Sequence, residues 1–513
     1  MQFEPIDGLR ALSHLGIILL HAEAFVTAHL PNEGRLWDSL RSHLLFRAVG
    51  WQGFAVDIFF SLSGFLLTYN LVMNAKNSPP AVATYLAKRM GRMLPSMIVF
   101  LFFSFGILGE EFNRRDLAGK FNGLWPLLSL LPNYINLRHI PLSTGPLWSC
   151  FVDIHAGVMI LILITLGRAG GKSDYGGNSV VLAKRMIWIF LLVTIISLII
   201  RGYEFDENRK NEILAGKYHT YLCMLNPANY KWVVETYQRK CMHCASSRLS
   251  YPNLLYFYPS FPIDKFLASW GPMSKFHVGY HMGYYYLPSH LRFGPFTVGG
   301  ILACNVILAH TSPVKSVGAS SALSAWFWLF ISALVILFPF VGGNMVMSLS
   351  GPMQLLLNAV IRVAVSAAVA AYLYCTLVPK DHPWHWSLLR TFWSLPIWKP
   401  ISTVSFTSYV FHMRIMQEFN FNKSLRSAVG LRLPTGLEPS DDLSWILYGV
   451  HLAVVSFVAT FPLALLVHHF VEKPCDSYIR SLVDRFSGSY SRIAAQMDKG
   501  ENKSEKNLID KTK

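Results

Sequence analysis

Long apolar runs recur along the chain, and short polar stretches separate most of them. A helix needs roughly 17–25 residues to cross the hydrocarbon core of a bilayer, which is the length of most of these runs. Spans are predicted at residues 9–30, 52–74, 93–110, 145–167, 185–201, 294–311, 321–342, 354–378, 399–420 and 443–470. The pattern predicts an all-α polytopic membrane protein with about ten transmembrane helices.

Three segments depart from this alternation. Residues 202–293 are polar and rich in Tyr and Pro, which predicts a large aromatic-rich extramembrane loop, the cap, inside a membrane domain at 1–474. The shorter apolar patch at 123–137 is typical of a re-entrant or interfacial piece. Residues 475–513 are charged and are expected to be a solvated cytoplasmic tail. Because this tail is basic, both termini are expected in the cytosol, with the cap outside or in the lumen.

Composition agrees with a chain surrounded largely by lipid. Of its 513 residues, 52% are hydrophobic and 14% are charged, whereas soluble chains carry roughly 25% charged residues. The net charge of +16 would suggest nucleic acid binding in a soluble protein. Here Lys and Arg lie mostly between apolar runs, so topology and anionic lipids explain them better. We expect an integral, multi-pass protein of the plasma membrane or an endomembrane, with membrane lipids and no nucleic acid as partners.

The seven cysteines do not indicate a metal site. Cys150, Cys304 and Cys375 fall within apolar runs and are expected to be small core residues. The other loop cysteines include a Cys-Met-His-Cys segment that begins at Cys241, where a zinc site needs a second pair of ligands that is not evident. A disulfide within the cap stays open, and no metal is predicted.

The first span carries ionisable residues along one face. Arg10 and His21 are eleven positions apart, which places them about 20° off a common helix face and about 16 Å apart along the axis. His14 lies on the same stripe. Charged and titratable groups inside a membrane helix are costly unless they line a polar cavity, so the stripe indicates function.

The stripe also resembles the acyltransferase-3 family of membrane-bound O-acyltransferases, whose opening motif is an Arg, ten residues and a His. Six further segments resemble family motifs in the family's order: GFAVDIFFSLSGFLL, KRMGRMLP, GPLWSCFVDIH, LRFGPFTVGGILA, ISTVSFTSYVFH and FVEKP. Together the matches extend from residue 6 to residue 474. One departure is that the fourth span holds a single acidic residue, Asp153, where bacterial members carry a Glu-Glu pair.

The resemblance implies an enzyme that moves an acyl group, acetyl above all, from acyl-CoA to a hydroxyl of a carbohydrate or lipid. His21 would be the general base, because an imidazole near its ordinary pKa suits this step. Arg10 would hold the donor or stabilise developing negative charge. Arg89 and Arg92 share a helix face and would grip the phosphates of the donor, or else anchor the segment at the cytosolic interface. The acyl-CoA is a co-substrate, and no bound cofactor is expected.

The remaining motif residues have more open roles. Asp153 is a candidate catalytic residue that would orient His21 or pair with an Arg. Candidate substrate-binding positions from the other motifs are Asp57, Ser63, Trp148 and Arg292. His412 and Glu472 lie near span ends, where polar groups reach the interface cheaply, so a structural role is favoured for both. The alternative function is a transporter or lipid carrier that uses the stripe of Arg10, His14 and His21 as a proton or substrate path.

Overall fold

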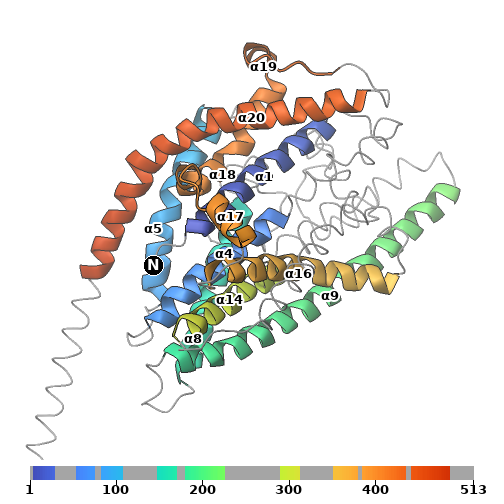
Figure 1. Ribbon diagram of the computed structural model, residues 1–513. Coiled ribbons are helices and arrows are strands. Elements are labelled where there is room, and N and C mark those ends of the chain that lie inside the picture. The colour runs from blue at the N-terminus through green and yellow to red at the C-terminus, as the bar shows by residue number, and fades with distance from the viewer. Residues whose placement is uncertain are drawn as a thin grey trace, which may run out of the picture.

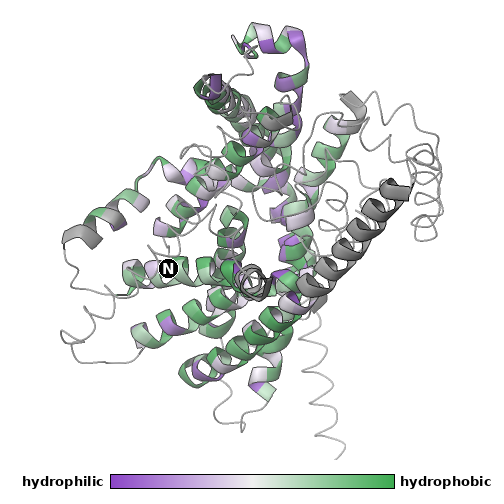
Figure 2. Cartoon of the chain, turned by 90° about the vertical axis from the view of Figure 1, so that its right-hand side faces the viewer, coloured by the Kyte–Doolittle hydropathy of each residue, from purple (hydrophilic) through white to green (hydrophobic). Residues whose placement is uncertain are grey.

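The computed structural model describes residues 4–28, 54–74, 82–107, 147–169, 179–225, 289–311, 351–378, 384–434 and 441–485. Every regular element in these ranges is a helix, as the apolar pattern predicts. Six of the helical segments are long and apolar enough to cross a membrane, by length and composition. Apolar residues predominate along the helices coloured in Figure 2. The chain is a membrane protein.

Nine of the ten predicted spans coincide with long helices or helical pairs. These are α1 (Glu4–Ala28), α4 (Ala55–Met73), α5 (Val82–Leu101) with η2 (Phe102–Ile107), α8 (Leu147–Ala169), α9 (Ser179–Leu225), α14 (Phe293–Thr311), α16 (Gly351–Leu377), α18 (Trp398–Phe421) and α20 (Asp442–Val467) with η11 (His468–Glu472). The shorter elements are η9 (Ser289–Arg292), α17 (Trp384–Trp393) and α19 (Lys423–Ala428). The predicted span at 321–342, the patch at 123–137 and cap residues 226–288 lie outside the described residues.

Three boundaries differ from the sequence prediction. α5 starts at Val82, ahead of the apolar run at 93–110, because its first turns are amphipathic and pack the partly buried Leu86 and Met90 against the core. α9 continues to Leu225, so the first part of the predicted cap extends the fifth span as a helix. Residues 475–485 were expected to be solvated tail, but they are helical and pack on α5, where Ile479 touches Gly91. The charged residues of this segment favoured solvent in the sequence prediction. The contact of Ile479 depends on packing against α5, which the charge pattern does not show.

The helices form two neighbouring groups (Figure 1). In one group α1, α18 and α20 pack together, and in the other α14 packs against α4, α9 and α16. α5 and α8 connect them, since α5 contacts α8, α18 and η11, and α8 contacts α4. A large apolar cluster runs through both groups, and a smaller one joins the last turns of α1 to the first turns of α20.

Glycines let α4 and α14 approach closely. A Cβ on Gly64 would lie 2.1 Å from the Phe296 carbonyl oxygen, and one on Gly299 would lie 1.9 Å from the Ser61 carbonyl oxygen. Small residues at such positions let helix backbones touch, which is a common form of packing in membranes. This contact holds the start of α4, which carries Asp57, beside the start of α14, which directly follows Arg292 of η9.

Candidate active site

Two parallel helices, α1 and α18, present the histidines of the site to each other. Asp7 accepts a hydrogen bond from Ser402 Oγ at 2.9 Å, and His14 Nε2 lies 2.8 Å from Ser408 Oγ. Farther along both helices, His21 Nδ1 lies 2.6 Å from His412 Nε2. The polar stripe predicted on the first span therefore faces a matching stripe on α18.

The hydrogen bonds define which nitrogen of His21 carries a proton. His412 Nδ1 lies 2.5 Å from the carbonyl oxygen of Tyr409. Because a carbonyl only accepts, His412 Nδ1 is the donor, and in the neutral ring its Nε2 is an acceptor. His21 must then donate from Nδ1, which leaves a lone pair on His21 Nε2. Among the described residues no hydrogen-bond partner of His21 Nε2 is found.

The hydrogen bonds that link His21, His412 and the Tyr409 carbonyl give His21 the arrangement of an activated base. His412 holds the His21 ring by a hydrogen bond and by near-parallel stacking, with ring centroids 4.9 Å apart. His14 adds an edge contact to His412, at 6.3 Å between centroids. A base that a third group orients is the recurring geometry of nucleophile activation. Here the orienting group is an imidazole, which is in turn held by a backbone carbonyl.

A group of three arginines lies toward the other end of the stripe. Arg10 is within electrostatic reach of Arg89 and Arg92 on α5, which repel it, and of Asp7, which attracts it. Among the described residues no hydrogen bond or ion pair of Arg10 is found. Three like charges in one place are costly unless counter-charges or an anionic ligand balance them.

Each arginine of α5 faces a carboxylate. Arg89 pairs with Asp153, and Ser63 donates to Asp153 while its oxygen also lies 3.2 Å from Arg89 Nη2. Of the two roles considered for Asp153, the structure has the pairing with an Arg, and no contact with His21 is found within the described part of the chain. Ser63, Arg89 and Asp153 thus form one polar cluster between α4, α5 and α8.

Arg92 faces Glu472 at the end of the molecule's last span. Arg92 Nε lies 4.0 Å from Glu472 Oε1, while Thr407 donates to Glu472 Oε2 at 2.8 Å and His468 Nδ1 lies 3.0 Å from the same oxygen. Glu472 belongs to the π-helical turn η11, a deformation that often marks a functional site. Glu472 as a whole is 3% exposed, so its carboxylate is held inside the protein.

Asp57 lies in a second buried cluster. Arg362 pairs with one of its oxygens, and Arg292 Nη1 lies 3.3 Å from the other. The Arg292 guanidinium also lies over the Trp148 ring, 5.4 Å from its centroid. The structure therefore joins the predicted substrate-binding residues Asp57, Trp148 and Arg292, and separately joins Ser63 to Arg89. Asp57 and both arginines are buried, so this cluster also holds α4, η9 and α16 together.

Two expectations from the sequence were wrong, and one residue was missed. His412 and Glu472 were expected to reach the interface from span ends, but both are buried because neighbouring helices cover them, with His412 0% exposed. Arg362 was not singled out, although an Arg within a long apolar run is the signal that identifies such residues. Cys150, Cys304 and Cys375 are buried and free, as expected. Over the described ranges no group of His, Cys, Asp and Glu suits a metal ion.

The comparisons with known proteins agree with the motifs. Residues 4–233 match the family model of the acyltransferase-3 family, which describes an acyltransferase domain. Over 174 residues the chain is 24% identical to "Regulator of hypoxia-inducible factor 1" of Caenorhabditis elegans, which covers 32% of this chain and 34% of that protein. The chain thus spans about a third of the length of this relative. No solved structure matches the chain.

The matched region contains Arg10, His21 and Arg89, together with the partners of Arg89 on α4 and α8, whereas His412 and Glu472 lie beyond it. The fold brings the later residues back onto the matched helices, so the site needs both parts of the chain. Residues 4–233, a little under half of the chain, are thus similar to the acyltransferase domain of the acyltransferase-3 family, as the motifs are.

Proposed function

We propose that the chain transfers an acyl group, acetyl above all, from acyl-CoA to a hydroxyl of a carbohydrate or lipid, with His21 as general base. The observation that carries this proposal is the hydrogen-bond chain from His21 through His412 to the Tyr409 carbonyl. It leaves the Nε2 lone pair of His21 without a partner among the described residues, as a base requires.

In the proposed reaction, His21 Nε2 takes the proton of the acceptor hydroxyl while its oxygen attacks the thioester carbonyl carbon. The C–S bond breaks as the tetrahedral intermediate collapses, and the imidazolium returns the proton to the leaving thiolate. Positive charge on His21 is shared with His412 through their hydrogen bond. The products are the acyl ester and CoA, so no further reactant is needed.

The arginines suit the donor. Arg10 and His21 lie on one helix, about 16 Å apart along its axis. In acyl-CoA a long arm separates the phosphates from the thioester, so phosphate binding and chemistry require separate places. Arg10 with Arg89 and Arg92 supplies the positive charge for phosphate oxygens, and charge-assisted bonds of this kind are strong.

The test is incubation of the purified full chain with labelled acetyl-CoA and a panel of glycans and lipids. Transfer of label by the native chain and its loss in His21→Ala, in correctly inserted protein, is the expected result. A general base contributes roughly 10²–10⁴-fold, so a variant that keeps a tenth of the activity would exclude His21 from this role. Binding of acetyl-CoA without transfer to any acceptor would favour the carrier alternative.

A further inference from the structure

A carboxyl group without a partner lies between α1 and α20. Glu23 is 8% exposed, and its Oε2 atom is buried with no hydrogen-bond partner in the part of the chain that the structure describes. No charged side chain of that part lies within electrostatic reach of Glu23. Glu23 is two positions beyond His21, about 160° around the helix, so it faces away from the proposed base. A polar group inside a membrane helix is costly unless something binds it, so Glu23 indicates a ligand site.

Glu23 borders a small pocket whose other walls are apolar. The pocket has a volume of about 30 Å³, and the other residues that line it belong to α1 and α20: Leu19, Val26, Trp445, Ile446, Gly449 and Val450. Gly449 keeps the space open, because a Cβ at this position would lie 3.0 Å from Val26 Cγ2. Val450 is 39% exposed, so the pocket opens on the outer surface of the helices.

The outer surface of α20 and η11 indicates how deep this pocket lies in the bilayer. The exposed residues between His451 and His469 are all apolar: Val454, Val458, Pro462, Leu465 and Leu466. At 1.5 Å per residue the two histidines are about 27 Å apart, close to the roughly 30 Å thickness of the hydrocarbon core. Both histidines are exposed, so they mark its two edges.

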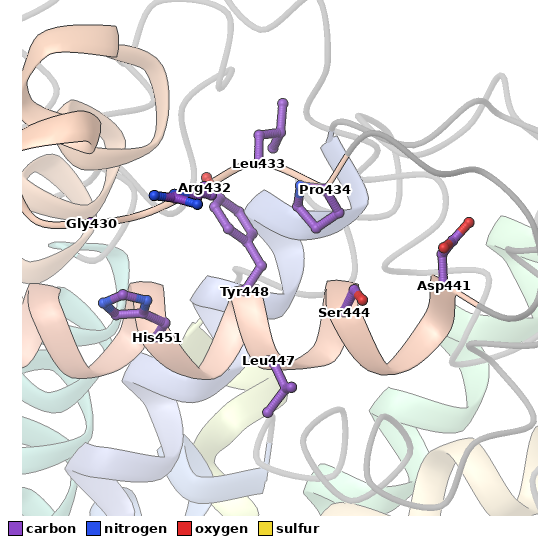
Figure 3. A pocket seen from close by; sticks show the side chains of 9 residues that line it. All are labelled: Gly430, Arg432, Leu433, Pro434, Asp441, Ser444, Leu447, Tyr448 and His451. Carbon is purple, nitrogen blue, oxygen red and sulfur yellow. The ribbon is translucent and has the colours of Figure 1, made fainter.

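The pocket lies at the edge that His451 marks, since Gly449 and Val450 directly precede this histidine. Figure 3 shows Ser444 and His451 at the same end of α20, around a wider pocket that Arg432 also lines. That wider pocket shares no lining residue with the pocket at Glu23. A ligand at Glu23 therefore has its polar group at the level of the lipid head groups, with hydrocarbon directly below.

The size and the lining of the pocket limit its occupant. A volume of 30 Å³ is about the share of one water molecule in the liquid, so a phosphate or sugar head group is too large. A buried water needs 2–4 polar partners, whereas the lining side chains offer one carboxyl group. An ammonium group has three N–H donors, and the two oxygens of Glu23 leave one of them unsatisfied. A hydroxyl on an apolar body suits both the carboxyl group and the apolar walls.

We propose that this pocket binds a membrane lipid whose head group is a single hydroxyl. The hydroxyl exchanges hydrogen bonds with the Glu23 carboxyl between α1 and α20. The hydrocarbon part leaves the pocket beside Val450 and follows the exposed apolar surface at Val454 and Val458. Because Glu23 faces away from His21, this site is separate from the proposed acyl-transfer centre and does not depend on it.

The experiment uses the full chain in detergent with a hexadecanol probe that carries a photoreactive diazirine and an alkyne. The matched ligand is the methyl ether of the same probe, which is larger and cannot donate. We expect the native chain to label with the alcohol about fivefold more than with the ether, as one net hydrogen bond allows. Glu23→Met should lower alcohol labelling to the level of the ether. Glu418→Met is the control, since Glu418 lies outside the pocket and pairs with Arg414 at 2.6 Å.

Gly449→Ala tests the pocket while Glu23 is kept. Its new Cβ fills part of the space, so we expect alcohol labelling to fall about fivefold with little change in Tm. Equal labelling by alcohol and ether in the native chain would overturn the proposal, and so would an undiminished preference in Glu23→Met or Gly449→Ala. Equal losses in Glu23→Met and Glu418→Met would show that the carboxyl group in the pocket is not the one that binds. Stronger displacement of the probe by hexadecylamine than by hexadecanol would assign Glu23 to a cation instead.

Discussion

At the scale of single residues, the site depends on how His21 is held. Its Nδ1 is committed to His412, and His412 is committed to the Tyr409 carbonyl. The carbonyl cannot change its role as an acceptor, so the direction of both hydrogen bonds is fixed while the rings are neutral. A residue on α18 thereby determines which nitrogen of His21 keeps the lone pair that the proposed base needs.

Replacing His412 tests this dependence. We expect His412→Phe to lower kcat by about 10²-fold, because the ring contact remains while the acceptor for His21 Nδ1 is lost and the base turns away. His412→Gln offers an amide oxygen as acceptor and should recover part of the activity. The measurement is label transfer from acetyl-CoA, with KM and kcat determined separately. Equal losses in the two variants, or a loss confined to donor KM, would contradict a positioning role.

At the scale of helical elements, the helical segment that follows α20, from η11 to residue 485, meets α5 at two carboxylates in different surroundings. Glu472 is buried beside Arg92, whereas Asp484 is exposed and pairs with Lys88 at 2.8 Å. Arg92 is 42% exposed and is repelled by Arg10, so without a fixed counter-charge its side chain turns out toward solvent. The buried carboxylate holds Arg92 near the other arginines.

We therefore expect Glu472→Gln to raise the KM for acetyl-CoA by about tenfold, the change that corresponds to roughly 1.4 kcal/mol. The KM for the acceptor should not change. Asp484→Asn is the control between the same elements, and it should have little effect because exposed pairs contribute only about 0–1 kcal/mol. A lower donor KM in Glu472→Gln would show that the carboxylate mainly neutralises Arg92, and would disprove the positioning role.

A second prediction at this scale concerns the glycine contact of α4 and α14. In Gly299→Ala the new Cβ overlaps the Ser61 carbonyl oxygen, so backbone must move, and overpacking of this kind typically costs about 1–3 kcal/mol. We expect a lower Tm in detergent and less monodisperse protein. Ala169→Val adds bulk at an exposed position of α8 and should leave Tm nearly constant. An unchanged Tm in Gly299→Ala would mean that the helices separate without cost.

The sequence predicted the helices better than it predicted their partners. Apolar runs identify spans because lipid requires every backbone polar group to be satisfied within the helix. Arg10, His14 and His21 were found from their common face, since helical spacing is a local property. The role of His412 and the pairing of Asp153 with Arg89 depend on which helices pack together, and no local pattern contains that information. Likewise, the burial of Glu472 results from α5 and α18 covering it.

At the scale of the whole molecule, helix directions constrain the number of crossings. α1 and α18 run parallel, because Asp7, His14 and His21 meet Ser402, Ser408 and His412 in the same order. α18 is the eighth of the long helices described, counting α5 with η2 as one. If each of these helices crosses the membrane once, the eighth must run opposite to the first. Because α1 and α18 run parallel, an odd number of further membrane crossings must lie between them in the chain.

The position of the further crossing can be narrowed. α4 and α14 also run parallel, since Asp57, Phe60 and Phe65 lie beside Arg292, Phe296 and Gly299 in that order. α4 and α14 are the second and sixth of the long helices described, and two such helices run parallel if each helix crosses the membrane once. Their parallel directions therefore need no further crossing between them. The further crossing must precede α4 or follow α14. Of the segments left, residues 312–350 contain the apolar run at 321–342 that predicts a span.

Single cysteines on either side of this run test the prediction. We expect Ser316→Cys to react with a membrane-impermeant maleimide only after permeabilisation, and Ser348→Cys to react in intact cells that carry the chain at their surface. Both are compared with the parent chain, so that label on native cysteines is subtracted. Lys423→Cys, which follows the parallel helix α18, should react like Ser348→Cys because both lie at the outer end of a predicted span.

Reaction of Ser316→Cys and Ser348→Cys from the same side of the membrane would disprove the predicted span at 321–342. The parallel pair of α1 and α18 would then require its odd crossing in the segment between α1 and α4.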